Sequence, residues 1–310
     1  MADTQYCYTS QRKGLSPIVS DGLHVFVCDI QKHILTTECT VYDVSQCNNK
    51  RVFTKTGNLF WIACDKNQVL LKVGYSGGIL DKLVRKIGVY LYTSDYGVEH
   101  KADYTIDYSI PKAKNKEVEL VCAGLIEIST ESDALGCDQF TIKTCGNGDC
   151  LYSGAKKGSL FVFDTFALWE DNEGSILLLN YIDNRKYELP DEIKRCINQG
   201  KFGGIIINGA LIYKTDEGLF LWNLENGNKE TIIEKRNINM FCVYGHKLYI
   251  GVDDSIMEID MDTENINEYS IEQIGTCYFV VVDGICYYTT NSNYNSSIDN
   301  VRIIELNKEC

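Results

Sequence analysis

Proline and long apolar runs are scarce in this sequence, and their scarcity limits the possible architectures. The 310 residues include only 3 prolines, at positions 17, 111 and 190, and no proline-rich or Gly/Ser-rich stretch divides them. We therefore expect a single domain over residues 1–310. No apolar run approaches the roughly 18 residues of a membrane-spanning helix, and the first residues lack the basic start and apolar core of a secretory signal. These absences predict a cytoplasmic protein that does not engage a membrane.

Residue patterns that bind metals or cofactors are also missing. The 4 histidines show no metal-ligand spacing, and none of the 14 cysteines forms Cys-x-x-Cys. The nearest pair, Cys145 and Cys150, offers at most half of the ligands that a structural zinc ion needs. No phosphate-binding Gly-x-x-x-x-Gly-Lys-Ser/Thr motif occurs. We expect no cofactor, no metal site, and cysteines that stay reduced and buried as small apolar residues.

Positive charge is in deficit. Acidic residues outnumber basic ones by 43 to 30, which gives a net charge of −13 and an isoelectric point near 4.8. Such a surface repels phosphate backbones, so we expect no direct binding of nucleic acid. It would instead favour a protein partner of basic character.

What the sequence does contain is a repeat. Eight glycines each separate an alternating apolar run from a second short run rich in Leu, Tyr, Phe or Val, at intervals of 31 to 51 residues. These glycines are Gly22, Gly57, Gly88, Gly124, Gly158, Gly209, Gly245 and Gly284. A near-constant period in this range is typical of a repeat architecture.

The last third of the chain shows the repeating unit most clearly. Short strands are predicted over residues 205–207, 210–214, 219–224 and 230–234, joined by tight turns such as Asn208-Gly209. The same order returns between residues 240 and 270. One antiparallel meander of four strands cannot bury both of its faces alone, whereas meanders stacked around an axis bury them all. The sequence therefore predicts an all-β fold, a single β-propeller of four-stranded blades.

The number of blades and the closure of the ring follow from the spacing. Eight anchors suggest eight blades, but the 31 residues between Gly57 and Gly88 barely hold four strands, so we predict seven and keep eight as the alternative. The final unit supplies only three strands, and we expect residues 1–12 to provide a closing strand that completes it. Residues 190–200, which begin with a proline followed by acids, predict a short helical insertion.

One segment in the last third resembles a known repeat family. Residues 218–228 place Trp222-Asn223 at the end of a third strand, where a WD40 repeat carries its Trp-Asp pair, and Asp260 stands at the same position of the next unit. The Gly-His pair of that family is absent from its expected places. The resemblance is to degenerate WD40-like propellers, and it implies a non-catalytic scaffold for protein partners.

One nucleophile motif is present. Gly74-Tyr75-Ser76-Gly77-Gly78 matches the Gly-x-Ser-x-Gly elbow, which needs a strand before it and a helix after it in a parallel sheet. Because the rest of the chain predicts hairpins, a glycine-rich turn between blade strands is the favoured interpretation. Ser76 as a nucleophile stays an open alternative.

The function predicted from these observations is a non-catalytic cytoplasmic scaffold. Its loops would bind another protein, as part of a larger assembly. The alternative is a propeller enzyme or carbohydrate-binding protein with its site at the channel mouth. We predict no catalytic residue. Trp169, which precedes an acidic stretch, is the one candidate for partner binding, because it is the tryptophan expected to approach solvent.

Overall fold

The protein was analysed as a computed structural model that describes the chain in segments. These are residues 5–10, 15–16, 18–32, 37–65, 68–76, 84–93, 97–107, 116–121, 126–132, 138–144, 148–156, 160–163, 165–171, 173–181, 183–198, 202–234, 237–252, 255–271, 278–290 and 300–306. Strands make up most of them, arranged in seven antiparallel sheets of four strands each. Apart from these strands, the described residues form one α-helix and one 3₁₀ turn.

The chain divides into two compact units. The first comprises residues Met1–Ser76, Lys86–Asp103 and Ile238–Cys310. One sheet has the spatial order β1 (Gln5–Thr9), β28 (Asn300–Glu305), β27 (Ile285–Thr290) and β26 (Phe279–Val282), and a second has the order β2 (Val19–Ser20), β3 (Val25–Lys32), β4 (Thr37–Asp43) and β5 (Lys50–Thr56). A third sheet consists of β22 (Ile238–Tyr244), β23 (Lys247–Val252), β24 (Ser255–Asp260) and β25 (Ile266–Ser270). This unit also holds the greater part of the sheet formed by β6 (Asn58–Asp65), β7 (Gln68–Ser76), β8 (Val84–Thr93) and β9 (Gly97–Asp107).

The second unit comprises Gly77–Arg85 and Tyr104–Asn237. Its sheets are β10 (Lys116–Val121), β11 (Ile126–Ser132), β12 (Asp138–Thr144) and β13 (Cys150–Lys156); β14 (Leu160–Val162), β15 (Phe166–Glu170), β16 (Ile176–Asn180) and β17 (Arg185–Glu188); and β18 (Gly203–Ile207), β19 (Ala210–Thr215), β20 (Gly218–Asn223) and β21 (Lys229–Glu234). Helix α1 (Asp191–Asn198) follows Pro190, and its buried Ile193 and Ile197 belong to the core formed by this unit's strands.

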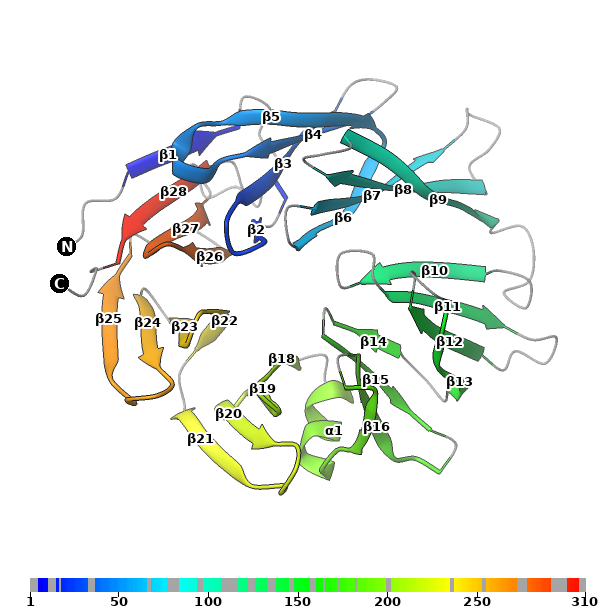
Figure 1. The fold of residues 1–310 in the computed structure, drawn as a ribbon, viewed down its shortest axis with the longest axis vertical. Helices are drawn as coiled ribbons and strands as arrows, with labels where there is room; N and C mark the ends of the chain where they lie inside the picture. The colour runs from blue at the N-terminus through cyan, green and yellow to red at the C-terminus, as the bar shows by residue number, and fades with distance from the viewer. Residues whose placement is uncertain are drawn as a thin grey trace. The chain divides into compact units, whose positions relative to one another are not determined.

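The first strand completes the last sheet. β1 pairs antiparallel with β28, with Gln5 opposite Ile303 and Thr9 opposite Asn300, although 291 residues separate Thr9 from Asn300 in the chain. Figure 1 shows β1, in blue, beside the red β28. Cys7 from β1 is buried in an apolar cluster that also contains side chains from β3 and β27. The predicted closure by the N-terminal strand is confirmed.

Seven sheets also confirm the predicted blade number. Gly88, one of the eight repeat anchors, lies inside strand β8 and does not begin a blade. By contrast, Gly209 and Gly284 lie in the first hairpin of their sheets, with φ of +76° and +72°. This left-handed conformation is open to glycine at little cost, which is why glycine recurs at these turns.

The hairpin between the third and fourth strands repeats in detail from sheet to sheet. Asn223 closes β20; its side-chain oxygen accepts backbone hydrogen bonds from the turn, and its carbonyl accepts one from the Gly227 amide. Asp260 closes β24 in the same way, and its carbonyl accepts from the Glu264 amide. A short side chain with an oxygen at this position caps the turn, which explains why Asn and Asp recur there.

Candidate functional site

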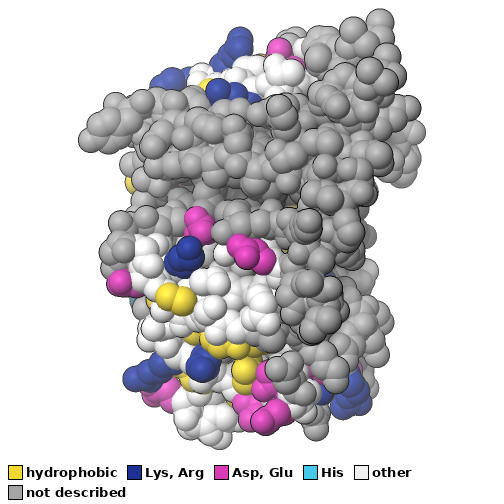
Figure 2. Space-filling view, turned by 90° about the vertical axis from the view of Figure 1, so that its right-hand side faces the viewer, with side chains coloured by type: hydrophobic (Ala, Val, Ile, Leu, Met, Phe, Trp, Pro, Cys, Tyr) yellow, Lys and Arg dark blue, Asp and Glu magenta, His cyan; other side chains and the backbone are white. Residues whose placement is uncertain are grey.

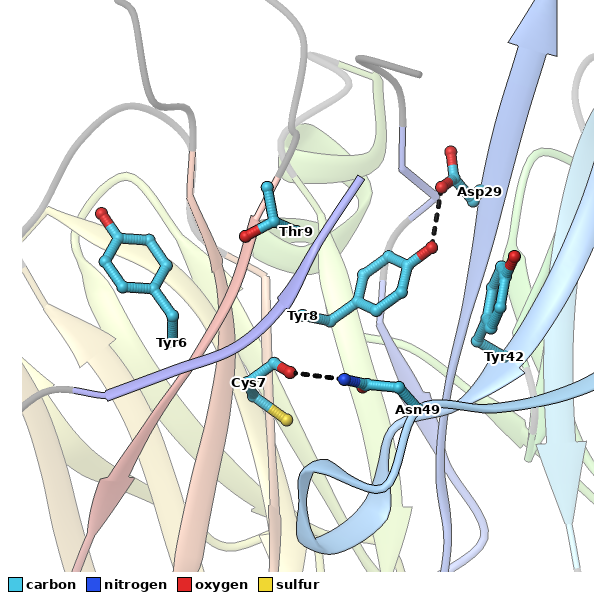
Figure 3. A pocket seen from close by; sticks show the side chains of 7 residues that line it. All are labelled: Tyr6, Cys7, Tyr8, Thr9, Asp29, Tyr42 and Asn49. Atoms are coloured by element: carbon cyan, nitrogen blue, oxygen red, sulfur yellow. Dashed lines mark hydrogen bonds between the residues drawn. The ribbon is translucent and has the colours of Figure 1, made fainter. Parts of the chain in front are cut away.

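A polar pocket of about 400 Å³ lies beside the closing strand in the first unit (Figure 3). Its lining residues are Tyr6, Cys7, Tyr8, Thr9, Asp29, Tyr42 and Asn49. Strand β1 supplies the first four, β3 supplies Asp29, β4 supplies Tyr42, and Asn49 directly precedes β5. The pocket therefore forms because β1 pairs with β28, from the other end of the chain, and so lies beside β3 and β4.

A buried carboxylate is the central feature of this pocket. Asp29 is only 3% exposed, and its two oxygens accept hydrogen bonds from the Tyr8 hydroxyl and the Ser10 hydroxyl, each at 2.7 Å. In Figure 3 the Tyr8 hydroxyl points at Asp29 from across the pocket. No lysine or arginine in the described part of the chain pairs with this carboxylate. A buried charge is costly unless it is hydrogen-bonded, and here two hydroxyl donors from the closing segment satisfy it.

Two tyrosine rings form the aromatic wall beside the carboxylate. The Tyr8 and Tyr42 ring centroids are 5.1 Å apart, with a tilt of 38° between the ring planes. Burial, and then the neighbouring Asp29, raises the pKa of the Tyr8 phenol far above its usual value. Tyr8 therefore keeps its proton and acts as a hydrogen-bond donor.

The thiol in the pocket is held in its protonated form. Cys7 is 5% exposed, and its sulfur donates to the Val44 carbonyl at 3.2 Å. Burial, reinforced by the adjacent Cys47, raises the pKa of the Cys7 thiol well above its usual value. The Asn49 amide nitrogen donates to the Cys7 carbonyl at 3.0 Å, which ties β1 to the start of β5. Because thiolates and not thiols are nucleophiles, this environment disfavours covalent chemistry at Cys7.

The rim of the pocket already carries one guanidinium–aromatic contact. Tyr6 is 62% exposed, whereas Arg302, opposite it on β28, is 4% exposed. A guanidinium nitrogen of Arg302 donates to the Tyr6 hydroxyl at 2.7 Å, and its central carbon lies 4.5 Å from the Tyr6 ring centroid. The arrangement is a cation–π contact supplemented by a hydrogen bond.

Taken together, these groups can bind a polar ligand and orient it. The pocket presents a carboxylate, an amide, hydroxyls and aromatic faces, but the raised pKa values of the Tyr8 phenol and the Cys7 thiol disfavour the anionic forms that attack a substrate.

A second, smaller pocket of about 220 Å³ lies in the other unit, beside α1. Here the acid on α1 is already paired with a base, although Asp216 and Glu217 also line the pocket. The Lys229 ammonium lies 2.7 Å from a Glu192 oxygen, and it also lies 4.1 Å from the Phe220 ring centroid. Burial acts to raise the pKa of Glu192, but hydrogen bonds from Lys229 and Tyr213 outweigh it and lower that pKa. An acid already paired in this way has little left to offer a ligand.

Trp169 and Ser76, the residues singled out from the sequence, are not among the described residues that line these two pockets. Trp169, on β15, is 1% exposed, and its ring centroid lies 5.2 Å from Phe140 and 4.6 Å from Tyr152. The expectation that it approaches solvent is wrong, because β15 is buried on both faces up to Trp169, and the first exposed acid after it is Glu173. The Trp169 side chain therefore offers almost no area to a partner.

Ser76 is the last residue of β7, and β7 pairs antiparallel with β6 through Asn58 and Gly74. The Gly-x-Ser-x-Gly elbow requires a parallel sheet, which this pair does not provide. The residues that follow Ser76, 77–83, are outside the described part, so the helix of the elbow is not tested. Cys145 also lies outside it, and Cys150 is an exposed free thiol.

A search of the described residues for three or more clustered His, Cys, Asp or Glu side chains able to hold a metal finds none. In the same residues, no helix is both long and apolar enough to cross a bilayer.

Sequence reasoning missed Asp29, Tyr8 and Asn49. One signal was available, because Asp29 follows Val25-Phe26-Val27-Cys28 in an apolar strand, where a charge needs a partner. That partner lies in a strand paired with the other end of the chain, so local pattern could not identify it.

Comparison with known proteins is informative only at the level of fold. No protein-family model matches the sequence, and no curated protein does. Among solved structures, the chain is similar to the β-propeller domain of the Trilobed protease from Pyrococcus furiosus, which has an open Velcro topology, with 11% identity over 97% of this chain and 96% of that one, at a TM-score of 0.59.

An uncharacterized protein from Listeria monocytogenes EGD-e is similar at 10% identity and a TM-score of 0.54, over 96% of this chain and 97% of that one. The acylaminoacyl peptidase of Pyrococcus horikoshii is similar at 8% identity and a TM-score of 0.53, over 91% of this chain but only 50% of its own length. Together with the seven four-stranded sheets and the closing strand, these likenesses show that the chain folds as a single β-propeller.

Proposed function

We propose that this propeller is a non-catalytic scaffold of the cytoplasm that binds a protein partner of basic character, as a subunit of a larger assembly. The observation that carries the proposal is the pocket beside the closing strand, where a buried carboxylate, an amide and tyrosine faces converge without an activated nucleophile. Tyrosine is enriched at interaction hot spots because it combines a large apolar face with a polar end.

The described groups of this pocket are poorly suited to nucleophilic catalysis. A nucleophile is activated by lowering its pKa or by placing a base beside it. The pKa values of Cys7 and Tyr8 are both raised, chiefly by burial, and the carboxylate nearest Tyr8 raises its pKa further. These groups serve recognition better than bond making.

The basic character of the partner follows from charge. The chain carries a net charge of −13, which would attract a positive surface and speed its encounter. On the face drawn in Figure 2, acidic and basic side chains intermingle on the described part around a few apolar ones. That face is therefore a weaker candidate for a basic partner than the pocket, where no lysine or arginine of the described residues pairs with Asp29.

The repeats themselves are proposed to be degenerate relatives of WD40 repeats, acting as one domain over residues 1–310 with residues 190–200 as an insertion. Support comes from Trp222, whose indole nitrogen donates to the Gly227 carbonyl at 3.2 Å, and from Asn223, which caps the same turn. Both residues thus stabilise the hairpin that ends the third strand.

The function is tested by affinity capture from native extract at low and at high salt, using the full chain as bait. A protein recovered in stoichiometric amount at low salt, and released as salt is raised, is the expected result, because screening weakens attraction between exposed charges. Recovery of the bait alone under gentle conditions contradicts the proposal. A partner that is acidic, or whose retention does not change with salt, contradicts its electrostatic part.

A carbohydrate ligand is the second candidate, and one observation favours it. Tyr6, which is 62% exposed, lines the same pocket as the Thr9 hydroxyl and the Asn49 amide, and such groups can stack on a sugar ring and bond its hydroxyls. A glycan array with the purified chain distinguishes this candidate from the first.

A further inference from the structure

We propose that the pocket beside the closing strand binds the guanidinium group of an arginine side chain presented by the partner. This inference rests on the proposed protein-binding function and names the chemistry that its site would recognise. Its site is the set formed by Asp29, Tyr42, Asn49 and Thr9, which line the pocket together with the other β1 residues.

The first step is the charge balance of the pocket. Asp29 is 3% exposed, yet its described partners are two neutral hydroxyls. A carboxylate has about four lone-pair positions, so two hydrogen bonds leave acceptor capacity unused. The buried anion is thus hydrogen-bonded but not neutralised by any described lysine or arginine. A cation entering the pocket would gain more from this charge than from the same charge in water, because the surroundings screen it less.

The second step is the placement of the other acceptors. The nitrogen of the Asn49 amide is used on the Cys7 carbonyl, so the oxygen of that amide is the atom left to accept a hydrogen bond. Asn49 is exposed and has a left-handed φ of +52°, and its side chain is held by the hydrogen bond to the Cys7 carbonyl. Thr9 is likewise exposed and adds a hydroxyl. The acceptors therefore surround the opening and do not cluster at one point.

The third step selects arginine over lysine. A guanidinium has five N–H donors in one plane, which suits acceptors spread around a pocket, and its flat face stacks on aromatic rings. Tyr42 and Tyr8 supply such rings 5.1 Å apart, which is too close for a group to enter between them but leaves their outer faces for stacking. Tyr6 and Arg302 display the same pairing within the protein, 4.5 Å apart. An ammonium would satisfy fewer of these groups at once.

The pocket beside α1 shows the contrast. Its Glu192 is already paired with Lys229 at 2.7 Å, and Arg195 also lines it. A cationic ligand would have to displace that lysine. Unlike Glu192, Asp29 pairs with no lysine or arginine of the described residues, and this distinguishes the two buried or partly buried carboxylates.

Titration calorimetry with peptides that differ in one side chain tests the inference. The probes are three capped peptides of identical glycine-serine backbone, with arginine, lysine or citrulline at the centre; citrulline keeps the shape of arginine and removes its charge. We expect the arginine peptide to bind at least about tenfold more tightly than the citrulline peptide and more tightly than the lysine peptide. Equal affinities for arginine and citrulline would overturn the proposal.

Three variants locate the binding. Asp29→Asn keeps the shape of the side chain and should lower affinity for the arginine peptide at least about tenfold. Asp262→Asn removes the same charge from a hairpin tip that is 70% exposed, and should leave affinity unchanged. An equal loss in both variants means diffuse attraction and overturns the site. Asn49→Gly removes a mouth acceptor without straining the positive φ, and should weaken binding severalfold even if Asp29→Asn does not fold.

The two proposals fail separately. If extract proteins captured by the wild-type chain are retained equally by a folded Asp29→Asn variant, the scaffold function stands and the arginine pocket is wrong. If no protein is captured but the arginine peptide binds selectively, the pocket stands and the scaffold function is wrong. Binding of a neutral oligosaccharide that is lost in Asn49→Gly, without selectivity among the peptides, would overturn the arginine pocket in favour of a sugar site.

Discussion

The hydroxyl of Tyr8 should contribute measurably to the closure of this propeller. It lies on β1, donates to Asp29 on β3 at 2.7 Å, and so joins the strand that completes the last sheet to the first sheet. Tyr8→Phe removes only this oxygen and leaves the ring contact with Tyr42 in place. Asp29, 3% exposed, would then keep the Ser10 hydroxyl as its one side-chain donor among the described residues.

The loss in the free energy of unfolding expected for Tyr8→Phe follows from the burial and the charge of Asp29. A hydrogen bond to a charged group contributes about 1.5–3 kcal/mol, and leaving part of a buried carboxylate unsatisfied places this case in that range. Urea denaturation, followed by far-UV circular dichroism, measures the change in free energy of unfolding. Tyr244→Phe is the matched control, because the Tyr244 hydroxyl donates to Asp283 at 2.8 Å in an exposed setting, where we expect about 0.5 kcal/mol. Equal losses in the two variants, or none for Tyr8→Phe, would refute the reasoning.

Three further predictions concern other parts of the fold. Deletion of residues 1–12 removes β1 and leaves β28 as an open edge, so we expect a lower melting temperature and association of the shortened chain on gel filtration; an unchanged melting temperature argues against the role given to β1. Glu192→Gln should destabilise the protein at pH 7 and have little effect well below pH 4. The pKa of Glu192 is lowered in the folded protein, so its contribution to the free energy of unfolding is present above the pKa of the unfolded chain and is lost as the pH falls through the folded pKa. A difference between variant and wild type that does not change with pH in urea titrations would contradict this. In Gly218→Ala, which has a φ of +146°, the added Cβ would overlap a backbone oxygen of β21, and the free energy of unfolding should fall by at least about 3 kcal/mol. In Gly209→Ala the added Cβ meets no atom, and the loss should be about 1 kcal/mol. Equal melting temperatures for the two variants would contradict this.

The sheets of the last third could be predicted from sequence because their signals are local. The predicted strands 210–214 and 219–224 match β19 and β20 to within one residue at each end. Tight turns between them carry glycine or a capping Asn or Asp, and such turn chemistry depends only on neighbouring residues. The same reasoning counted Gly88 as an anchor, although it lies within a strand, because a glycine in a strand and a glycine in a turn look alike in sequence.

The site could not be predicted, because its parts meet only through long-range pairing. Trp169 was singled out from its acidic neighbours, but its strand is covered on both faces, and that depends on elements far from it in sequence. Ser76 matched a motif whose meaning depends on parallel strands, and β7 pairs antiparallel with β6. Asp29 became informative only once Tyr8 and Ser10 were placed against it.

The sequence alone determined the repeating four-strand unit, the antiparallel order within it, the acidic charge and the need for a strand to complete the last unit. These properties arise from the alternation of apolar residues, from the conformations that individual turn residues allow and from composition, all of which are local or additive. Only the tertiary structure decided which side chains share a pocket. The carboxylate of Asp29, the hydroxyl of Tyr8 and the amide of Asn49 come together because β1 pairs with β28, and the free energy of that pairing belongs to the whole fold and not to any one segment.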